Sequence, residues 1–183
     1  MNFKEIETKY YATSIAMDDF VKLVDPMNPE WIMVSSYDDY FVNDKDEFIR
    51  YRYHDNMGEL TIKRKTTDNN NLKRLEVNIK TESKSSKSVS AFVELLGYKP
   101  NFSIFKTCKI AFLEKVVLVY YIVYDQNLNE LNRFIEVEAR EDYKWSNEEA
   151  AWEEVLKYEK TLEPLGITSR NRLKKSLFEL FKK

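Results

Sequence analysis

Charged residues of like sign recur two positions apart in segments where charged and apolar residues otherwise alternate. Side chains two apart share one face of a β-strand, so each doublet places two like charges on the same face. Opposite charges stabilise a solvated sheet and like charges destabilise it, so stability alone does not explain the pattern. A bound polyanion bridged by metal ions would explain it. The doublets are Glu5/Glu7, Arg50/Arg52, Lys63/Lys65 and Glu136/Glu138.

This alternation predicts the fold class, an α+β chain built on an eight-stranded antiparallel β-barrel with helices outside and a helical C-terminal tail. The barrel would enclose a tunnel whose charged wall accepts a polyanion and metal ions. No repeat or linker divides the chain, so we expect one domain over residues 1–183, with C-terminal helices at about 146–182. The eight strands are expected over residues 4–11, 33–41, 47–54, 59–65, 72–80, 103–112, 115–125 and 132–140.

Local signals predict where helices and turns lie. Helices are expected over residues 14–24, 89–96, 146–162 and from 168 or 169 to 181. Ser146 and Glu149 have the spacing of a capping box at the start of the third helix. The segment 55–58 is expected to form a hairpin turn, with Gly58 where a positive φ is tolerated.

The charged faces of the strands together form a large polar set. Burying so many dry ions would cost several kcal/mol each, so the barrel is expected to be wide and filled with water. The acids would hold metal ions and the bases would hold phosphates. The acids are Glu5, Glu7, Glu76, Asp125, Glu136 and Glu138, and the bases are Lys9, Arg50, Arg52, Lys63, Lys65, Arg74 and Lys106.

Composition limits the partners and the metal. The 183 residues are 43% hydrophobic and 33% charged, with a net charge of −2, which gives no basic field for nucleic acid. One cysteine, Cys108, and one histidine, His54, cannot form a disulfide or a multi-histidine metal site. Carboxylates must hold any metal, which favours Mg²⁺ or Mn²⁺. With no signal peptide and no apolar run long enough to span a membrane, we expect a cytoplasmic protein with no membrane partner.

The outward apolar residues of the barrel need cover. Tyr120, Ile122 and Tyr124 form such a stripe in the segment 115–125. Either the helices or a second subunit is expected to cover it, so a homodimer is one possible assembly.

The order of the motifs resembles the CYTH superfamily, the triphosphate tunnel metalloenzymes. Glu5-Ile6-Glu7-Thr8-Lys9 is similar to the ExExK signature of that family, and later segments follow in the family's order over about residues 3–140. Those segments are Asp38-Asp39-Tyr40-Phe41, Phe48-Ile49-Arg50-Tyr51-Arg52, Thr61-Ile62-Lys63-Arg64-Lys65, Arg74-Leu75-Glu76, Leu96-Gly97-Tyr98, Lys106, Asp125 and Phe134-Ile135-Glu136-Val137-Glu138.

The resemblance implies a role for each charged position. Glu5, Glu7 and Glu138 are the main metal ligands that it implies, supported by Glu136 and Glu76. Catalytic roles would fall to Lys9, Asp125 and Glu76, with Asp125 orienting basic residues or water. The phosphate-binding residues that it implies are Lys9, Arg50, Arg52, Lys63, Lys65, Arg74 and Lys106.

Two positions depart from the family pattern. Asn78 stands where the family usually has a glutamate, and Cys108 stands where it usually has an arginine. Lys109 follows one place late and is expected to face outward unless a bulge re-aims it. Cys108 is expected to be a tolerated replacement and not a nucleophile.

Three functions fit these patterns. The first is metal-dependent hydrolysis of inorganic tripolyphosphate or a nucleoside triphosphate, which needs positioning and charge neutralisation more than covalent chemistry. The second is a class IV adenylyl cyclase that makes cyclic AMP and pyrophosphate from ATP. The third is a non-catalytic protein that binds or sequesters a nucleotide or polyphosphate, which Asn78 and Cys108 favour.

Overall fold

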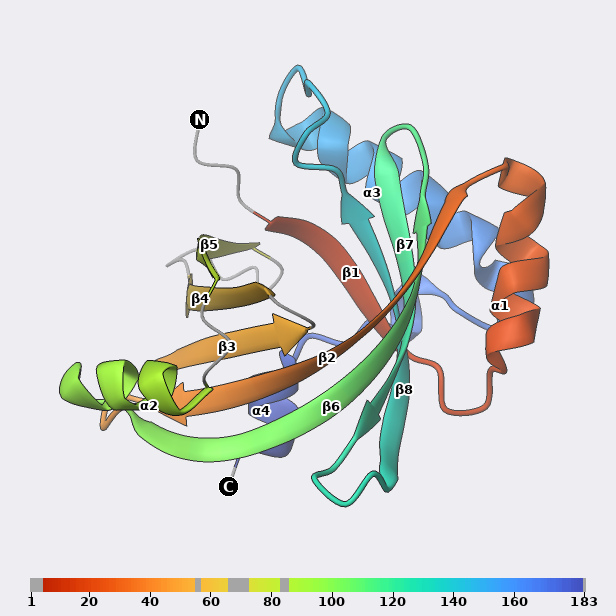
Figure 1. Ribbon diagram of the computed structural model, residues 1–183. Helices are drawn as coiled ribbons and strands as arrows, with labels where there is room; N and C mark the ends of the chain where they lie inside the picture. The colour runs from red at the N-terminus through yellow and green to blue at the C-terminus, as the bar shows by residue number, and fades with distance from the viewer. Residues whose placement is uncertain (1–4, 55–56, 66–72, 83–85, 183) are drawn as a thin grey trace. The chain divides into compact units, whose positions relative to one another are not determined.

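The computed structural model describes residues 5–54, 57–65, 73–82 and 86–182 (Figure 1). The chain forms two compact units. Unit 1 comprises residues 1–34, 107–123 and 131–174, and unit 2 comprises residues 35–106, 124–130 and 175–183. The expectation of a single domain over residues 1–183 stays a prediction.

Eight strands form one antiparallel sheet, with neighbours in the barrel order β1-β5-β4-β3-β2-β6-β7-β8. The predicted fold class is therefore confirmed. The strands are β1 (Glu5–Tyr11), β2 (Glu30–Val42), β3 (Phe48–His54), β4 (Met57–Lys65), β5 (Lys73–Thr81), β6 (Lys99–Phe112), β7 (Val116–Tyr124) and β8 (Glu130–Ala139).

The helices pack against strands of their own units. The α-helices are α1 (Met17–Val24), α2 (Ser86–Leu95), α3 (Glu148–Thr161) and α4 (Leu177–Phe181). The short 3₁₀ helices are η1 (Asp25–Met27), η2 (Glu163–Leu165) and η3 (Ser169–Asn171). Among the described residues, no helix combines the length and the apolar composition needed to cross a membrane.

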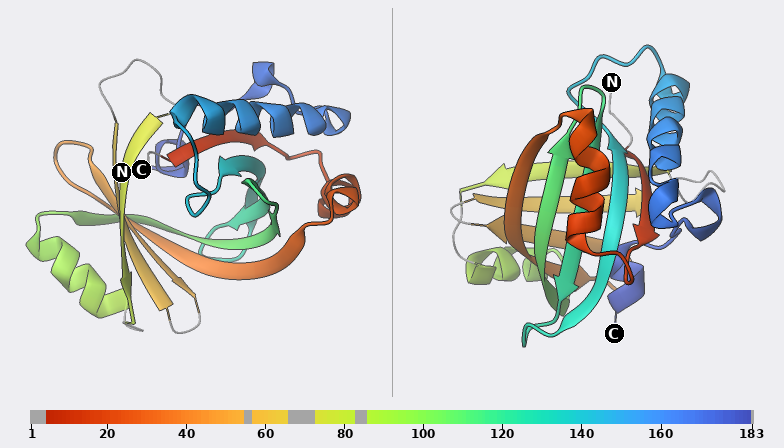
Figure 2. Two further views of the ribbon diagram at one scale, coloured as in Figure 1. Left: turned by 90° about the horizontal axis from the view of Figure 1, so that it is seen from above. Right: turned by 90° about the vertical axis from the view of Figure 1, so that its right-hand side faces the viewer.

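The core of unit 1 lies between its strands and helices α1 and α3. Helix α3 runs along β1, as the left view of Figure 2 shows. Tyr120 of β7 is fully buried, donates its hydroxyl to the carbonyl oxygen of Ile15 at 2.7 Å, and has its ring 5.7 Å from that of Phe20 in α1. The predicted outward stripe is thus covered by a helix at Tyr120.

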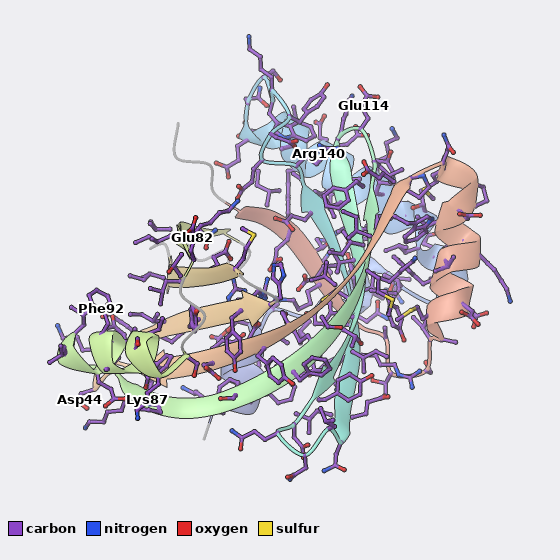
Figure 3. All side chains as sticks on the ribbon, viewed as in Figure 1. Asp44, Glu82, Lys87, Phe92, Glu114 and Arg140 are labelled. Carbon is purple, nitrogen blue, oxygen red and sulfur yellow. The ribbon has the colours of Figure 1, made fainter. Side chains whose placement is uncertain are left out.

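The apolar core of unit 2 lies under α2. Val89 and Val93 of this helix pack with buried Ile49 and Tyr51 of β3. Phe92 of the same helix, labelled in Figure 3, stays exposed.

Gly58 serves a different purpose from the one predicted. Gly58 lies in strand β4, opposite Tyr53, and its φ is not positive. The prediction that it lies in a turn with a positive φ is therefore wrong. A Cβ placed on Gly58 would lie 2.4 Å from the hydroxyl oxygen of Tyr51 and 2.7 Å from its ring. Glycine is required here because the buried ring of Tyr51 approaches the backbone.

Two predictions about the C-terminal helices are wrong in detail. Asn147, not Ser146, caps α3, because its side chain accepts a hydrogen bond from the backbone N–H of Ala150 at 2.8 Å. The final helix does not run unbroken from residue 168 or 169 to 181. Arg172 instead pairs with Tyr10 of β1, and the chain turns helical again only after Ser176, which forms its own capping box with Glu179.

Candidate functional site

An acidic group lies in unit 1, on the face of β1 and β8 that points away from the apolar core. We use this name for Glu7, Glu136 and Glu138. Glu7 pairs directly with Glu138, and Lys9 pairs with Glu136, in the register of the two strands. The Nζ of Lys9 lies 2.7 Å from Glu136 Oε1 and 3.5 Å from Glu7 Oε1. Lys9 thus contacts two of the three carboxylates.

Tyr121 of β7 completes the acidic group. Its hydroxyl donates a hydrogen bond to Glu136 Oε1 at 2.8 Å, the same oxygen that Lys9 contacts. Burial raises the pKa of Tyr121 well above its usual value, and the neighbouring charge of Glu136 adds to the shift. The phenol therefore stays protonated at neutral pH and donates a hydrogen bond to Glu136, which holds this carboxylate beside Lys9.

A metal site made by protein side chains alone is not present in the described part of the chain. No group of three or more histidine, cysteine, aspartate or glutamate side chains is close enough together there to hold a metal ion. The side chain of Glu5, a predicted metal ligand at the start of β1, lies outside the described residues. The pair Glu7 and Glu138 supplies the carboxylate oxygens that Mg²⁺ prefers, and Mg²⁺ commonly takes its other ligands from substrate phosphates.

A basic group lies in unit 2, and we use this name for Arg50, Arg52 and Lys106. Arg50 and Arg52 share one face of β3 because they lie two residues apart. Asp38 of β2 stands directly opposite Arg52 and accepts two hydrogen bonds from it, at 2.8 and 2.9 Å. The Nζ of Lys106 lies 2.9 Å from the second oxygen of Asp38. One carboxylate thus holds two of the three cations.

The charge of Asp38 is set by these neighbours. The carboxylate is fully buried, and burial alone would raise its pKa. The positive charges of Arg52 and Lys106 outweigh burial and hold the pKa of Asp38 well below its usual value. Asp38 is therefore ionised at every pH where the chain would work, and it keeps both cations charged and oriented.

Arg50 is held by a second set of partners on β4. Its Nη2 lies 2.8 Å from the hydroxyl of Thr61 and 3.3 Å from Glu59 Oε1. The Thr61 hydroxyl also lies 2.7 Å from Oδ1 of Asn78 on β5. The amide at the departure from the family pattern is therefore linked through Thr61 to a predicted phosphate-binding arginine.

Besides Glu5, four predicted site residues have side chains outside the described part of the chain, namely Lys63, Lys65, Arg74 and Glu76. Their backbone register in β4 and β5 is known, with Lys63 opposite Glu76 and Lys65 opposite Arg74. This register places one base opposite an acid, Lys63 and Glu76, and two bases opposite each other, Lys65 and Arg74. Their catalytic and phosphate-binding roles stay predictions.

Asp125 lies in the turn between β7 and β8, where its carboxylate makes hydrogen bonds within the turn. Its carboxylate accepts hydrogen bonds from the backbone N–H groups of Asn127 and Asn129 and from the side-chain amide of Asn129, at 2.8 to 2.9 Å. The side-chain hydrogen bond from Asn129 is the largest of the effects that lower its pKa. The structure thus shows a turn-stabilising use of Asp125, and its predicted catalytic role stays a prediction.

Lys109 does not replace the missing arginine at Cys108. Its Nζ lies 5.0 Å from the centre of the Trp31 ring, a cation–π contact. Lys106 and Cys108 share the other face of β6 by alternation. The expectation that Lys109 faces outward agrees with this contact.

The sequence pattern missed side chains that hold these two groups in place, among them Asp38 and Tyr121. In the sequence, Asp38 stands out only as part of a motif that resembles the family. Its position on the strand that precedes Arg52, across a short connection, could have indicated that the two residues form a pair. Tyr121 lies in a run of apolar residues with no alternation of apolar and polar side chains, and both Tyr120 and Tyr121 are buried in the structure. No signal in the sequence separates it from its neighbours.

Comparison with known proteins gives matches among solved structures. No protein-family model matches the chain, and no curated protein sequence matches it. A conserved hypothetical protein from Pyrococcus furiosus is 26% identical and has a TM-score of 0.73, with 97% of this chain and 99% of that chain covered. A protein from Pyrococcus horikoshii OT3 is 18% identical, with a TM-score of 0.76 and coverage of 97% and 99%.

A third match carries a functional description. A structure from Bacillus halodurans, described as a "putative adenylate cyclase", is 17% identical, with a TM-score of 0.63 and coverage of 97% and 96%. Together these likenesses show the fold. Membership of the CYTH superfamily stays a prediction.

Proposed function

We propose that this chain is a metal-dependent triphosphatase, which binds inorganic tripolyphosphate or a nucleoside triphosphate with Mg²⁺ or Mn²⁺ and hydrolyses it. One observation carries the proposal most directly. Glu7 and Glu138 stand directly opposite each other on neighbouring strands, so two carboxylates that could share one metal ion lie side by side on the same face. Lys9 and Glu136, one step along the same face, supply a charged partner that phosphate oxygens can approach.

The described residues favour a metal that enters with its ligand. Two facing carboxylates are too few to enclose Mg²⁺, which requires six ligands in near-octahedral geometry. Oxygens of a triphosphate and water would fill the remaining positions. We therefore expect metal and triphosphate to bind cooperatively, with Glu7 and Glu138 as metal ligands and Glu5 as a further predicted ligand.

The basic group would bind phosphate oxygens. Arg50 and Arg52 offer planar guanidinium groups suited to paired hydrogen bonds with phosphate, and Lys106 offers a point charge. Asp38 orients two of these cations in advance, so less conformational freedom is lost when the phosphates bind. Lys63, Lys65 and Arg74 are proposed to extend the same phosphate contacts.

Hydrolysis then requires little covalent chemistry from the protein. Water attacks the terminal phosphorus and the bond from that phosphorus to the bridging oxygen breaks, so negative charge develops on the leaving phosphate. A bound divalent metal ion supplies charge neutralisation and lowers the pKa of bound water. In this proposal Lys9, which lies 2.7 Å from Glu136, would donate a hydrogen bond to a phosphate oxygen, and Arg50 and Arg52 would neutralise charge.

A product assay tests the proposal. The chain is incubated with tripolyphosphate or ATP in the presence of Mg²⁺ or Mn²⁺, with and without EDTA, and phosphate, ADP, pyrophosphate and cyclic AMP are separated. Metal-dependent release of phosphate is expected, and both Glu7→Gln and Glu138→Gln should reduce its rate by at least about a hundredfold. Glu141→Gln, at an exposed residue just beyond β8, is the matched control and should keep the wild-type rate. An unchanged rate in Glu138→Gln would refute the metal assignment.

A second candidate is a class IV adenylyl cyclase, and the Bacillus halodurans neighbour favours it. In that reaction the ribose 3′-oxygen attacks the α-phosphorus and pyrophosphate leaves. Cyclic AMP and pyrophosphate in the same assay would replace ADP and phosphate as products. Tight binding of the nucleotide without turnover under either metal would favour the third candidate, a non-catalytic binding protein, which Asn78 and Cys108 motivate.

A further inference from the structure

Tyr11 ends the charged face of β1 with a partly exposed aromatic ring. Glu7, Lys9 and Tyr11 share this face because they lie two residues apart, whereas Tyr10 and Ala12 belong to the apolar core. The Tyr11 side chain is 44% exposed. It pairs with Phe134 of β8, and the two ring centres lie 5.4 Å apart. The partly exposed ring of Tyr11 thus lies at the end of the row of charged side chains on this face.

The two strands present three successive rungs on this face. The first rung is the acid pair Glu7 and Glu138, the second joins Lys9 to Glu136, and the third joins Tyr11 to Phe134. Successive rungs are two residues apart, roughly 7 Å, so the first and third are separated by about 14 Å along the strands. The order is carboxylate, ammonium, aromatic ring.

The aromatic rung is physically continuous with the charged one. Phe134 is fully buried and stacks on Tyr121, with ring centres 5.2 Å apart. The hydroxyl of Tyr121 donates to the same oxygen of Glu136 that Lys9 contacts. A packed chain of contacts therefore runs from Lys9 through Glu136, Tyr121 and Phe134 to Tyr11. The ring of Tyr11 therefore packs against Phe134 and keeps part of its surface exposed to solvent.

We infer that the ligand is a nucleoside triphosphate and that Tyr11 is the stacking platform for its base. This inference rests on the proposed function and specifies its substrate class. A nucleoside triphosphate carries its groups in the same order as the rungs, with metal-binding phosphates first, the inner phosphate next and the base last. Inorganic tripolyphosphate has no group for the third rung. Stacking uses the π-face that every base presents, so the platform selects for a base without reading its identity.

Equilibrium binding tests the inference. Affinities are measured by calorimetry with Mg²⁺ for adenylyl imidodiphosphate and for the base-free imido analogue of tripolyphosphate, in both of which a nitrogen bridge to the terminal phosphate resists hydrolysis. Tyr11→Ala should weaken binding of the nucleotide analogue by about 5- to 150-fold, the range expected for loss of one base–aromatic stack. Binding of the base-free analogue should change less than about twofold, because no stack is lost.

Two further variants separate stacking from folding. Tyr11→Phe keeps the ring and should keep the wild-type affinity for the nucleotide. Tyr11→Leu keeps apolar cover over Phe134 and should still lose affinity for the nucleotide. Tyr37→Ala is the matched control, because Tyr37 on β2 is 46% exposed and stacks on Tyr53 but lies on the opposite face of its strand from Asp38.

The outcomes distinguish this inference from the proposed function. If wild-type protein binds both ligands and Tyr11→Ala binds the nucleotide as tightly as wild type, the platform is refuted and triphosphate binding stands. If Tyr11→Ala or Tyr11→Leu weakens both ligands equally, the role of Tyr11 is structural and the platform is again refuted. If wild-type protein binds neither ligand, the proposed function falls and the platform falls with it.

Discussion

Arg52 and Asp38 form a bidentate ion pair that has a matched counterpart elsewhere in the chain. In unit 2, Nε and Nη2 of Arg52 donate to the two oxygens of Asp38 at 2.8 and 2.9 Å. In unit 1, the same atoms of Arg140 donate to the two oxygens of Asp142 at 2.8 and 2.6 Å. The Asp38 side chain has no exposure, whereas that of Asp142 is 69% exposed. The two pairs share geometry and differ in burial.

Removing the charge of Asp38 should therefore destabilise the fold far more than removing that of Asp142. Asp38→Asn leaves Arg52 and Lys106 without their buried counter-ion, which typically costs about 3–5 kcal/mol of the free energy of unfolding. Asp142→Asn loses a pair that water already screens, so its free energy of unfolding should stay close to that of wild type. Urea denaturation of the three proteins gives the comparison. Equal losses in both variants would contradict the role assigned to Asp38.

Acid should remove this stabilisation. The pKa of Asp38 is lower in the folded chain than in the unfolded chain, so the ionised group stabilises the fold above the ordinary aspartate pKa of about 3.9 and loses this effect as the pH falls below it. The difference in free energy of unfolding between wild type and Asp38→Asn should therefore be full near pH 6 and should shrink below about pH 4. Denaturation curves across this range measure it. A difference that stays constant down to about pH 2.5 would show that other groups carry the acid sensitivity.

The alternation of charge was sufficient to predict the strands and the faces of the acidic and basic groups. Arg50 and Arg52 share a face with their partners on β2 and β4, and Glu136 and Glu138 share a face opposite the apolar core. This succeeded because the side-chain period of a strand is two whatever the partner strand is. The water-filled bore itself stays a prediction.

Partners on strands distant in the sequence could not be predicted in the same way. The period of two places Asp38 and Lys106 on faces of β2 and β6, but it does not say that their atoms meet at 2.9 Å. That contact depends on the order of the strands in the sheet. The break in the last helix was missed for a similar reason, because pairing of Arg172 with Tyr10 of β1 overrides the local helical pattern.

Gly58→Ala should destabilise unit 2 through a clash with Tyr51. The added methyl group would lie 2.4 Å from the hydroxyl oxygen of a fully buried ring, and overpacking of this kind typically costs about 1–3 kcal/mol. Tyr51→Leu should remove most of the clash, so the double variant should lose clearly less than the sum of the single losses. Gly97→Ala is the control, since its Cβ would meet no atom within 4 Å and its cost, from a φ of +87°, should add independently to that of Tyr51→Leu. Additive losses in the Gly58 cycle would exclude the clash.

Arg172→Ala should release the segment that pairs with β1 while leaving the rest of unit 1 folded. Arg172 donates to both oxygens of Glu159, which also accepts the hydroxyl of Tyr10, and Leu173 donates its backbone N–H to the carbonyl oxygen of Lys9. A hydrogen bond to a charged group typically contributes about 1.5–3 kcal/mol, so exchange of the Leu173 amide hydrogen should become about 10- to 100-fold faster. Hydrogen exchange followed by NMR at this amide is the measurement.

Arg170→Ala is the matched control for this experiment, because Arg170 is an exposed arginine two residues earlier in η3. It should leave the exchange of the Leu173 amide at the wild-type rate. Burial alone would raise the pKa of Glu159, and the hydrogen bonds from Arg172 and Tyr10 lower it below its usual value, so the carboxylate stays ionised and continues to hold both donors at neutral pH. Exchange at the wild-type rate in Arg172→Ala would show that backbone pairing alone holds the segment. Equal acceleration in both arginine variants would show that the effect does not come from the contact between Arg172 and Glu159.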